Sequence, residues 1–467
     1  MKKALGAAPE ADAMTHARYG ILLTLAAAAT GCFDDAKLRP YDAGNDLAPP
    51  DVPVDPPDAD TPDVAPPPAD AAKDAGADAD LDAAPADAAK DAPGDVTPDF
   101  PPPDVAPGEC PIDRVLVGTS DYMATGGYAL GRFLPAPSLA ARTETSPDQD
   151  HAPVQSGCII YDLLRGNDEL AVLDRAALPT PARRIPLRAT MGATDRYQAN
   201  PYGVLTLSPT VAYVILYNAP RVAVVDPTMN GADAVRRTIN LSPLRSAMDR
   251  DTSGAMEASS IVRAGRYVFV ALQNLNAFMP VTNGTLAVID PTGDVLVDTD
   301  GATPDVDPVR LTGRNPFAMR VTPGGRLVVS ESGALGAGML DGGIEVVDPV
   351  SFAARGLRVT EAQLGGDVSD FVMLDDARGW VVVRQSATSS RVVEFDLDAA
   401  EAMRAGRTIV SSGDIAAIAR DPSGNVWVLD RTAGRAGARV FNTMGTEVTS
   451  APLATGAQPP AAIAFVP

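Results

Sequence analysis

The chain has 467 residues, 43 prolines and a formal net charge of -22 at pH 7, and its length allows two or three domains. The acidic excess argues against nucleic acid as a partner, because phosphate recognition needs a basic surface. With only His16 and His151 in the sequence, Ser-His-Asp and Cys-His catalytic arrangements have little support.

The N-terminal 31 residues have the pattern of a bacterial secretion signal. Basic Arg18 precedes an apolar run that is shorter than the roughly 20 residues needed to cross a bilayer. The run ends in Ala29-Thr30-Gly31-Cys32, which resembles the lipobox of bacterial lipoproteins. Translation starts at Met1 or at Met14, and the acidic residues between them favour Met14.

The lipobox resemblance implies that residues 1–31 are removed and that Cys32 is acylated. The acyl chains would bind the lipid bilayer, which places the protein on the outer membrane, facing either the periplasm or the cell surface. The alternative is an ordinary secreted protein in which Cys32 is a free thiol.

Residues 32–108 consist mainly of Pro, Ala, Asp and Val and show neither helical nor strand periodicity. Proline at this density disfavours helix and sheet, and the few apolar side chains cannot offset chain entropy. We expect a disordered tether that holds the following domain away from a membrane. The alternative is a binding peptide for proline-recognising domains.

Residues 109–467 repeat one phrase: an apolar strand, a short turn, and a second apolar strand that ends in Asp. The second strands end at Asp174, Asp226, Asp290, Asp348 and Asp396, and more weakly at Asn442. Their spacing of roughly 42 to 64 residues is that of a four-stranded propeller blade. Because Asp caps tight turns, we interpret these carboxylates as turn residues and not as ligands.

The clearest copy, from Tyr213 to Asp226, resembles the YVTN-type β-propeller repeat of secreted bacterial proteins. The resemblance implies an all-β fold and specifies no chemistry. Seven first strands predict seven blades, with six or eight as alternatives. The terminal strand, 460–466, has no repeat after it, and the first blade lacks an inner strand, so we expect the C-terminus to complete that blade and close the ring.

Two cysteines, Cys110 and Cys158, lie in the repeated region. Export permits oxidation, so a disulfide that pins the seam of the ring is expected. The alternative is a pair of free buried thiols.

Polar residues begin several of the predicted inner strands: His151, Asn200, Glu257, Asn315 and Asp414. They could ring one mouth of the central channel, where concave sites with convergent polar groups bind ligands. The alternative is solvated strand ends without a shared ligand. We assign no catalytic residue and no metal ligand, and interpret the aspartates between 298 and 307 as solvated turns.

These features favour a non-enzymatic, lipid-anchored propeller without a cofactor, which serves as a binding or scaffolding module. Its partner would be an envelope protein or a small ligand, bound at the mouth or at the predicted insertions 242–258 and 274–284. The alternative is a hydrolase or lactonase that uses calcium at the mouth, since calcium-dependent lactonase propellers are similar at the level of fold. A purely structural envelope protein is a third hypothesis.

Overall fold

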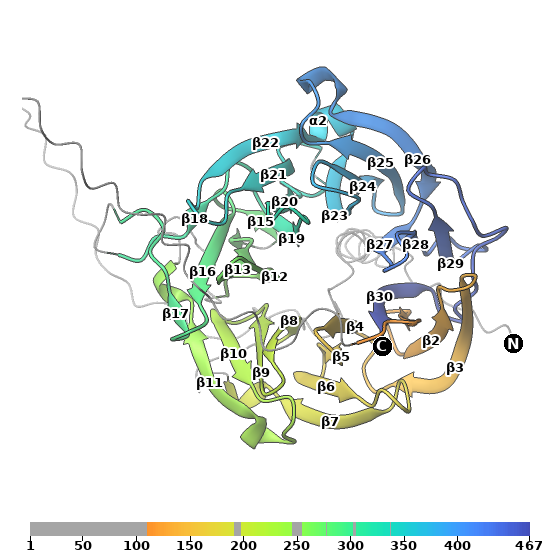
Figure 1. Cartoon of the computed structure of the whole chain (residues 1–467), viewed down its shortest axis with the longest axis horizontal. Helices are drawn as coiled ribbons and strands as arrows, with labels where there is room; N and C mark the ends of the chain where they lie inside the picture. Colours follow the sequence, from red (N-terminus) through yellow and green to blue (C-terminus); the bar gives the residue numbers. More distant parts are fainter. Residues whose placement is uncertain (1–109, 191–197, 245–254, 277, 302–304, 337) are drawn as a thin grey trace, which may run out of the picture. The chain divides into compact units, whose positions relative to one another are not determined.

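The computed structural model describes residues 110–190, 198–244, 255–276, 278–301, 305–336 and 338–467. The predicted signal, Cys32 and the predicted tether lie outside these residues. The described strands follow one another round a ring as the sheets of a seven-bladed β-propeller (Figure 1). This confirms the predicted fold class and blade number. Among the described residues, no helix has the length and hydropathy that a membrane crossing requires.

Each blade is an antiparallel sheet that runs from an innermost strand at the channel to an outermost strand at the outside of the ring. From the channel outward, blade 1 comprises β30 (Pro460–Val466), β1 (Arg114–Ser120), β2 (Gly126–Arg132) and β3 (Ser138–Ser146). Blade 2 comprises β4 (His151–Ser156), β5 (Ile159–Leu164), β6 (Glu169–Leu173) and β7 (Pro181–Pro186). Blade 3 comprises β8 (Pro201–Ser208), β9 (Val211–Leu216), β10 (Arg221–Val225) and β11 (Val235–Asn240).

Blade 4 comprises β12 (Ala258–Ala264), β13 (Tyr267–Leu272), β16 (Thr285–Asp290) and β17 (Val295–Leu296), with β18 (Val309–Arg310) also on β16. Blade 5 comprises β19 (Pro316–Val321), β20 (Leu327–Glu331), β21 (Gly343–Val347) and β22 (Ala354–Thr360). Blade 6 comprises β23 (Asp367–Met373), β24 (Arg378–Ser386), β25 (Ser389–Asp396) and β26 (Ala405–Gly413).

Blade 7 comprises β27 (Ile415–Arg420), β28 (Val426–Asp430) and β29 (Gly437–Phe441), with isolated bridges from Ala438 to Leu453 and from Phe441 to Glu447 at its outer edge. The remaining elements are the hairpin of β14 (Leu275–Asn276) and β15 (Met279–Pro280), the helix α2 (Glu361–Leu364), and four 3-10 turns: η1 (Arg188–Thr190), η2 (Ala232–Ala234), η3 (Ser242–Leu244) and η4 (Glu401–Met403).

The core lies between the blades, in seven separate apolar clusters. Strand β9 shows why its sequence is almost wholly apolar. Ala212, Val214 and Leu216 pack toward blade 2, whereas Tyr213 and Ile215 pack toward blade 4. Because side chains alternate across a strand, a sheet buried on both faces requires a continuous apolar run.

The Asp at the end of each third strand caps a turn, as predicted. The Oδ1 atoms of Asp226, Asp290 and Asp396 each accept the N–H two residues further on, at 2.9 Å. Asn442 makes the equivalent bond at 3.0 Å, which explains why it can replace Asp. These side chains are therefore engaged in local turns.

The C-terminal strand closes the ring. β30 pairs antiparallel with β1, from Arg114 opposite Val466 to Thr119 opposite Pro460. It is the innermost strand of blade 1 and contacts both β27 of blade 7 and β4 of blade 2. The predicted completion of the first blade by the terminal strand is confirmed.

A disulfide joins Cys110 to Cys158, with Cα atoms 5.7 Å apart. Cys110 precedes β1, and Cys158 lies in the turn between β4 and β5. The bridge therefore ties the first described residue of the chain to blade 2, beside the seam that β30 closes. In the chain-entropy model, a loop of this length stabilises the fold by about 4 kcal/mol.

We predict that removing residues 458–467 unfolds the whole domain. β1 would lose its ladder partner and expose a sheet edge, and β4 of the next blade would lose the strand that packs against it. Circular dichroism melting of the truncated protein tests this, with the intact chain as control. A truncated protein that melts at the unchanged temperature would show that the ring does not depend on β30.

Candidate ligand site at the channel mouth

One rim of the ring has the same construction in six of the seven blades. The residue at the end of the second strand donates its N–H to the carbonyl of the residue before the innermost strand, at 2.7 to 3.3 Å. These pairs are Ser120–Pro459, Arg165–Asp150, Tyr217–Asn200, Gln273–Glu257, Ser332–Asn315 and Arg431–Asp414. In blade 6 the ladder partners Arg384 and Asp367 occupy this place. We call these seven pairs the mouth ring.

Four of the predicted site residues, Asn200, Glu257, Asn315 and Asp414, occupy equivalent positions of the mouth ring. Three of them have left-handed backbones, with φ of 50° for Asn200, 43° for Glu257 and 55° for Asn315. Asparagine tolerates this conformation, whereas Glu257 adopts it at a conformational cost. The structure brings these residues to one rim, and their role in ligand binding stays a prediction.

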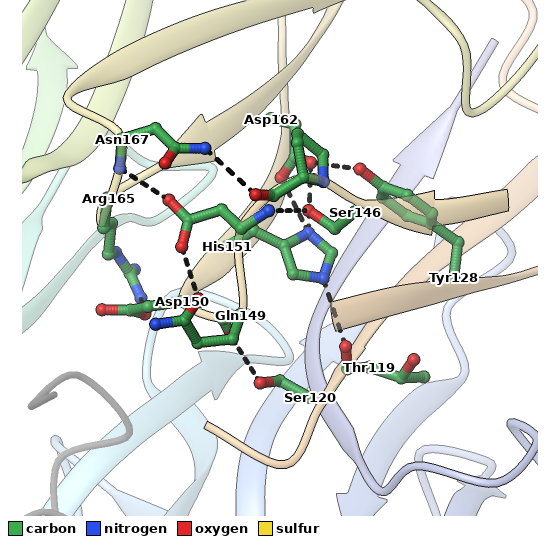
Figure 2. Close-up of polar contacts among 12 residues, drawn as sticks. Thr119, Ser120, Tyr128, Ser146, Gln149, Asp150, His151, Asp162, Arg165 and Asn167 are labelled. Atoms are coloured by element: carbon green, nitrogen blue, oxygen red, sulfur yellow. Dashed lines mark hydrogen bonds and ion pairs between the residues drawn. The ribbon is translucent and has the colours of Figure 1, made fainter. Parts of the chain in front are cut away.

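His151 does not line the mouth. Its side chain is 1% exposed between blades 1 and 2, with Nδ1 3.1 Å from Asp162 Oδ2 and Nε2 3.2 Å from the Thr119 carbonyl oxygen (Figure 2). Tyr128 donates its hydroxyl to the same Asp162 carboxylate at 2.6 Å. His151 is the first residue of β4, one position beyond Asp150, so its side chain points between the blades and Asp150 takes the place in the ring.

Three blades place an Asp and an Arg together in the mouth ring. In blade 2, Arg165 Nη1 lies 3.1 Å from Asp150 Oδ1. The other two pairs are Asp367 with Arg384 in blade 6 and Asp414 with Arg431 in blade 7. The sequence analysis missed the arginines and Asp367, because it considered only the starts of inner strands that were recognisable by their repeat.

The polar side chains of the mouth ring contact one another in blades 2 to 4 more than in blades 5 to 7. In blades 2 to 4 a continuous chain of contacts links the pairs. Arg165 lies 4.6 Å over the ring of Tyr202, Tyr202 stacks against Tyr217 at 4.9 Å, and Tyr217 donates 2.8 Å to Gln273 Oε1. These contacts link three neighbouring blades along the rim, although Asn200 Oδ1 and Asn274 Oδ1 in this region have no hydrogen-bond partner.

In blades 5 to 7 several buried polar atoms of the described residues have no hydrogen-bond partner. Those that belong to the mouth ring include Asn315 Oδ1 and Ser332 Oγ in blade 5 and Arg431 Nε in blade 7. A fourth ring atom of this kind is Asn200 Oδ1 in blade 3. Because buried polar atoms are normally paired, such atoms gathered at one rim indicate a place where water or a ligand supplies the missing bonds.

Charge is also concentrated in blades 6 and 7. Arg384 is only 8% exposed, and burial lowers its pKa, as does the like charge of Arg431, while the Asp414 carboxylate opposes the change. Burial raises the pKa of Asp414, against the effect of both arginines. The guanidinium of Arg431 lies 4.6 Å over the ring of Tyr122 from blade 1. Paired groups with perturbed pKa values in a concave rim are typical of functional sites.

A calcium-dependent lactonase would need a group of acidic ligands at the mouth. Within the part of the chain that the structure describes, the mouth ring holds no group of three acidic side chains close enough to share a metal ion. Glu257 Oε2 accepts the Leu275 N–H at 2.9 Å. Across the described ranges, the only set of three His, Cys, Asp or Glu side chains close enough to share a metal ion is Asp298, Asp300 and Asp307. That set belongs to the loop after β17, and Asp298 Oδ1 accepts backbone N–H groups of its own loop.

No family model matches the chain, and no curated protein matches it significantly. Solved structures do match. A candidate 6-phosphogluconolactonase from Bacteroides uniformis has a TM-score of 0.51 at 13% identity over 76% of this chain and 99% of its own. The periplasmic gluconolactonase of Pseudomonas aeruginosa has a TM-score of 0.50 at 14% identity over the same shares. At these identities the similarity shows the propeller fold alone.

The buried His151 predicts a pH-dependent contribution to stability. Burial alone would lower its pKa, but the charge and hydrogen bond of Asp162 outweigh this and raise the pKa above 6.5. The contact therefore stabilises the fold fully below about pH 6.5 and loses its effect as pH rises through the raised folded-state pKa.

We expect His151→Phe to destabilise the domain by about 3 kcal/mol at pH 6, because the buried Asp162 would lose its cationic partner and keep only the hydrogen bond from Tyr128. The difference from wild type should shrink toward pH 9. Urea unfolding across this pH range measures it, with the exposed Arg378→Gln as a control. A difference that stays constant with pH would contradict this account of His151.

Proposed function

We propose that the protein is a lipid-anchored, extracytoplasmic binding module whose ligand docks on the mouth ring at blades 5 to 7. The observation that carries this proposal is the set of buried polar atoms without partners on Asn315, Ser332 and Arg431. Asn315 and Ser332 of blade 5 share the rim with Arg384 of blade 6 and Arg431 of blade 7. Such a set suits a small polar ligand, or a polar group of an envelope protein.

The position of the chain's entry supports this role. Cys110 precedes the start of β1, whereas Ser120 of the mouth ring is at its end. Cys158, its disulfide partner, likewise lies at the end of blade 2 opposite Asp150 and Arg165. The chain therefore enters the described domain at the rim opposite the mouth ring.

The tether and anchor of the proposal rest on the sequence alone. Cys32 follows a lipobox-like segment, and residues 32–108 would supply a spacer of up to about 200 Å at the extended limit. Acyl chains bind a bilayer at about 0.8 kcal/mol per buried methylene, so several chains suffice for stable attachment.

We expect Arg431→Gln to abolish ligand binding with little effect on folding, because its guanidinium packs on the Tyr122 ring at the rim and not within an apolar cluster. A thermal-shift panel of small carboxylic acids and sugars, followed by calorimetry of each hit, measures this. Arg378→Gln, on the opposite rim, is the matched control. Hits whose affinity is the same in wild type, Arg431→Gln and Asn315→Ala would show that the site lies elsewhere.

The enzymatic alternative is tested by the same protein. Hydrolysis of D-glucono-1,5-lactone, followed by pH-stat with and without chelator, should not exceed the buffer rate. Turnover that the chelator removes and that Glu257→Ala abolishes would favour the calcium-dependent lactonase over the binding module.

The anchor makes a separate prediction. Replacing Cys32 with Ser should move the protein from the detergent phase to the aqueous phase in Triton X-114 partition, because the acylated thiol would be lost. Ser substitution at Cys158 is the control and should leave the partition unchanged. A Cys32→Ser protein that stays in the detergent phase would show that another feature anchors it.

A further inference from the structure

Blade 5 departs from the other blades at two buried positions of the repeat. The first position directly precedes the N–H donor of each mouth-ring pair, at the end of the second strand of the blade. It is Leu164, Leu216 and Leu272 in blades 2, 3 and 4, and Glu331 in blade 5. The residue three before the turn Asp is Ala171, Ala223 and Ala287 in the same blades, and Glu345 in blade 5. A Leu and Ala pair has thus become two glutamates.

These two glutamates lie on the same face of the sheet. Glu331 pairs with Gly343 and Val329 with Glu345 across β20 and β21, so Glu331 and Glu345 are diagonal neighbours. Leu327 and Val329, on this face of β20, pack with Phe269 of blade 4. The pair is therefore enclosed at the boundary between blades 4 and 5.

Both side chains are 0% exposed. The carboxylate of Glu345 is well bonded: Oε2 accepts Thr312 N–H at 2.8 Å, and Oε1 accepts Thr312 Oγ1 and Gly356 N–H at 2.9 Å. By contrast, neither carboxylate oxygen of Glu331 has a hydrogen-bond partner of normal geometry, and its polar neighbours are the Gly313 N–H and the Glu345 carboxyl. No arginine or lysine in the described part of the chain forms an ion pair with either glutamate.

Blade 7 shows how the fold accommodates a buried acid at this place. Its residues at the two positions are Asp430 and Arg439. Asp430 is fully buried, and Arg435 Nε lies 3.5 Å from its Oδ2. Arg439 donates hydrogen bonds to Glu447 at 2.7 and 2.9 Å, and these bonds together with the charges of Glu447 and Asp430 raise the pKa of Arg439. Where blade 7 provides a cation from its own sequence, blade 5 provides a second acid.

Two adjacent carboxylates in an apolar interface cannot both stay ionised unless a cation or a proton joins them. Burial raises the pKa of Glu331 well above its ordinary range, and the neighbouring Glu345 and Glu361 raise it further. Replacing two apolar residues with a pair of acids costs several kcal/mol in the absence of such a counter-charge.

We propose that Glu331 and Glu345 form a binding site for a hard divalent cation between blades 4 and 5. Carboxylate oxygens are the ligands that calcium prefers. Glu331 would supply both of its oxygens, and Glu345 a lone pair beyond the hydrogen bonds that it accepts, with carbonyls or water to complete the shell. Gly313 contributes by its size: a Cβ there would lie 2.2 Å from Glu331 Oε2. This site is separate from the mouth ring and goes beyond the binding role proposed above. A cation bound there would hold the 311–314 segment beside Ser332 of the mouth ring.

Calorimetry and thermal melting of the chelator-treated full chain, with calcium and with magnesium, test the proposal. We expect one equivalent of calcium to bind and to raise the melting temperature by at least about 2 °C at a hundredfold excess over the dissociation constant. Glu331→Gln should lose this response. The double variant Glu331→Leu, Glu345→Ala restores the residues of blades 2 to 4, and should fold and melt independently of calcium.

Two controls separate this site from others. Asp298→Asn with Asp300→Asn, in the surface loop of blade 4, and Asp430→Asn, in blade 7, should both keep the calcium response. A response that survives in Glu331→Gln but vanishes in the loop variant would overturn the proposal. So would a wild-type protein that ignores both metals, since a shared proton would then join the two acids. The calcium response is independent of the ligand proposed for the mouth ring, so an Arg431→Gln protein that no longer binds that ligand should still respond to calcium.

Discussion

Every part of this structure depends on burying both faces of each blade against its neighbours. A single blade exposes two apolar faces, as β9 illustrates with Val214 on one side and Tyr213 on the other. Seven blades provide seven interfaces only if the last meets the first, and β30 makes this possible by joining the sheet of β1. The closed ring then fixes the strand ends that carry the mouth ring.

This constraint explains where sequence alone was sufficient. Strands buried on both faces are continuous apolar runs, and the Asp that ends each third strand marks the turn by its own chemistry, so blade number and turn positions were predictable. The closure by residues 460–466 followed from counting: one blade lacked an inner strand and one strand lacked a blade. The placement of Asn200, Glu257, Asn315 and Asp414 on one rim follows from the same repeat.

The rest was not predictable, for reasons of register. A residue belongs to the mouth ring because it pairs with a residue of the neighbouring strand. Arg384 and Arg431 lie at the ends of second strands, so inspection of the inner strands alone could not identify them. A shift of one residue along a strand turns a side chain from the rim into a blade interface, which is why His151 is buried while Asp150 lies in the ring. Glu331 continues an apolar strand, and only comparison with Leu164, Leu216 and Leu272 at the same place shows that it is unusual.

The polar groups form a consistent picture. The fold tolerates buried charge where it is matched, as in His151 with Asp162, and where turn hydrogen bonds hold it, as in Asp430 with Thr432. Buried polar atoms without a hydrogen-bond partner occur in several blades, and those of Asn315, Ser332, Arg431 and Glu331 lie on or directly behind the rim of blades 5 and 7. Since a stable fold gains nothing from unmatched buried polar groups, this set, on the same rim as Arg384, is the structural basis for placing function there.

The central claim is that the terminal strand is an integral member of a closed ring, and native-state hydrogen exchange tests it most directly. The account predicts that the amides of β30 that bond to β1 exchange only through global unfolding, at the same rate as the central amides of β9 and β24. Exchange of β30 that is orders of magnitude faster than that of β9, while the rest of the domain stays protected, would contradict the closure and the mouth ring built on it.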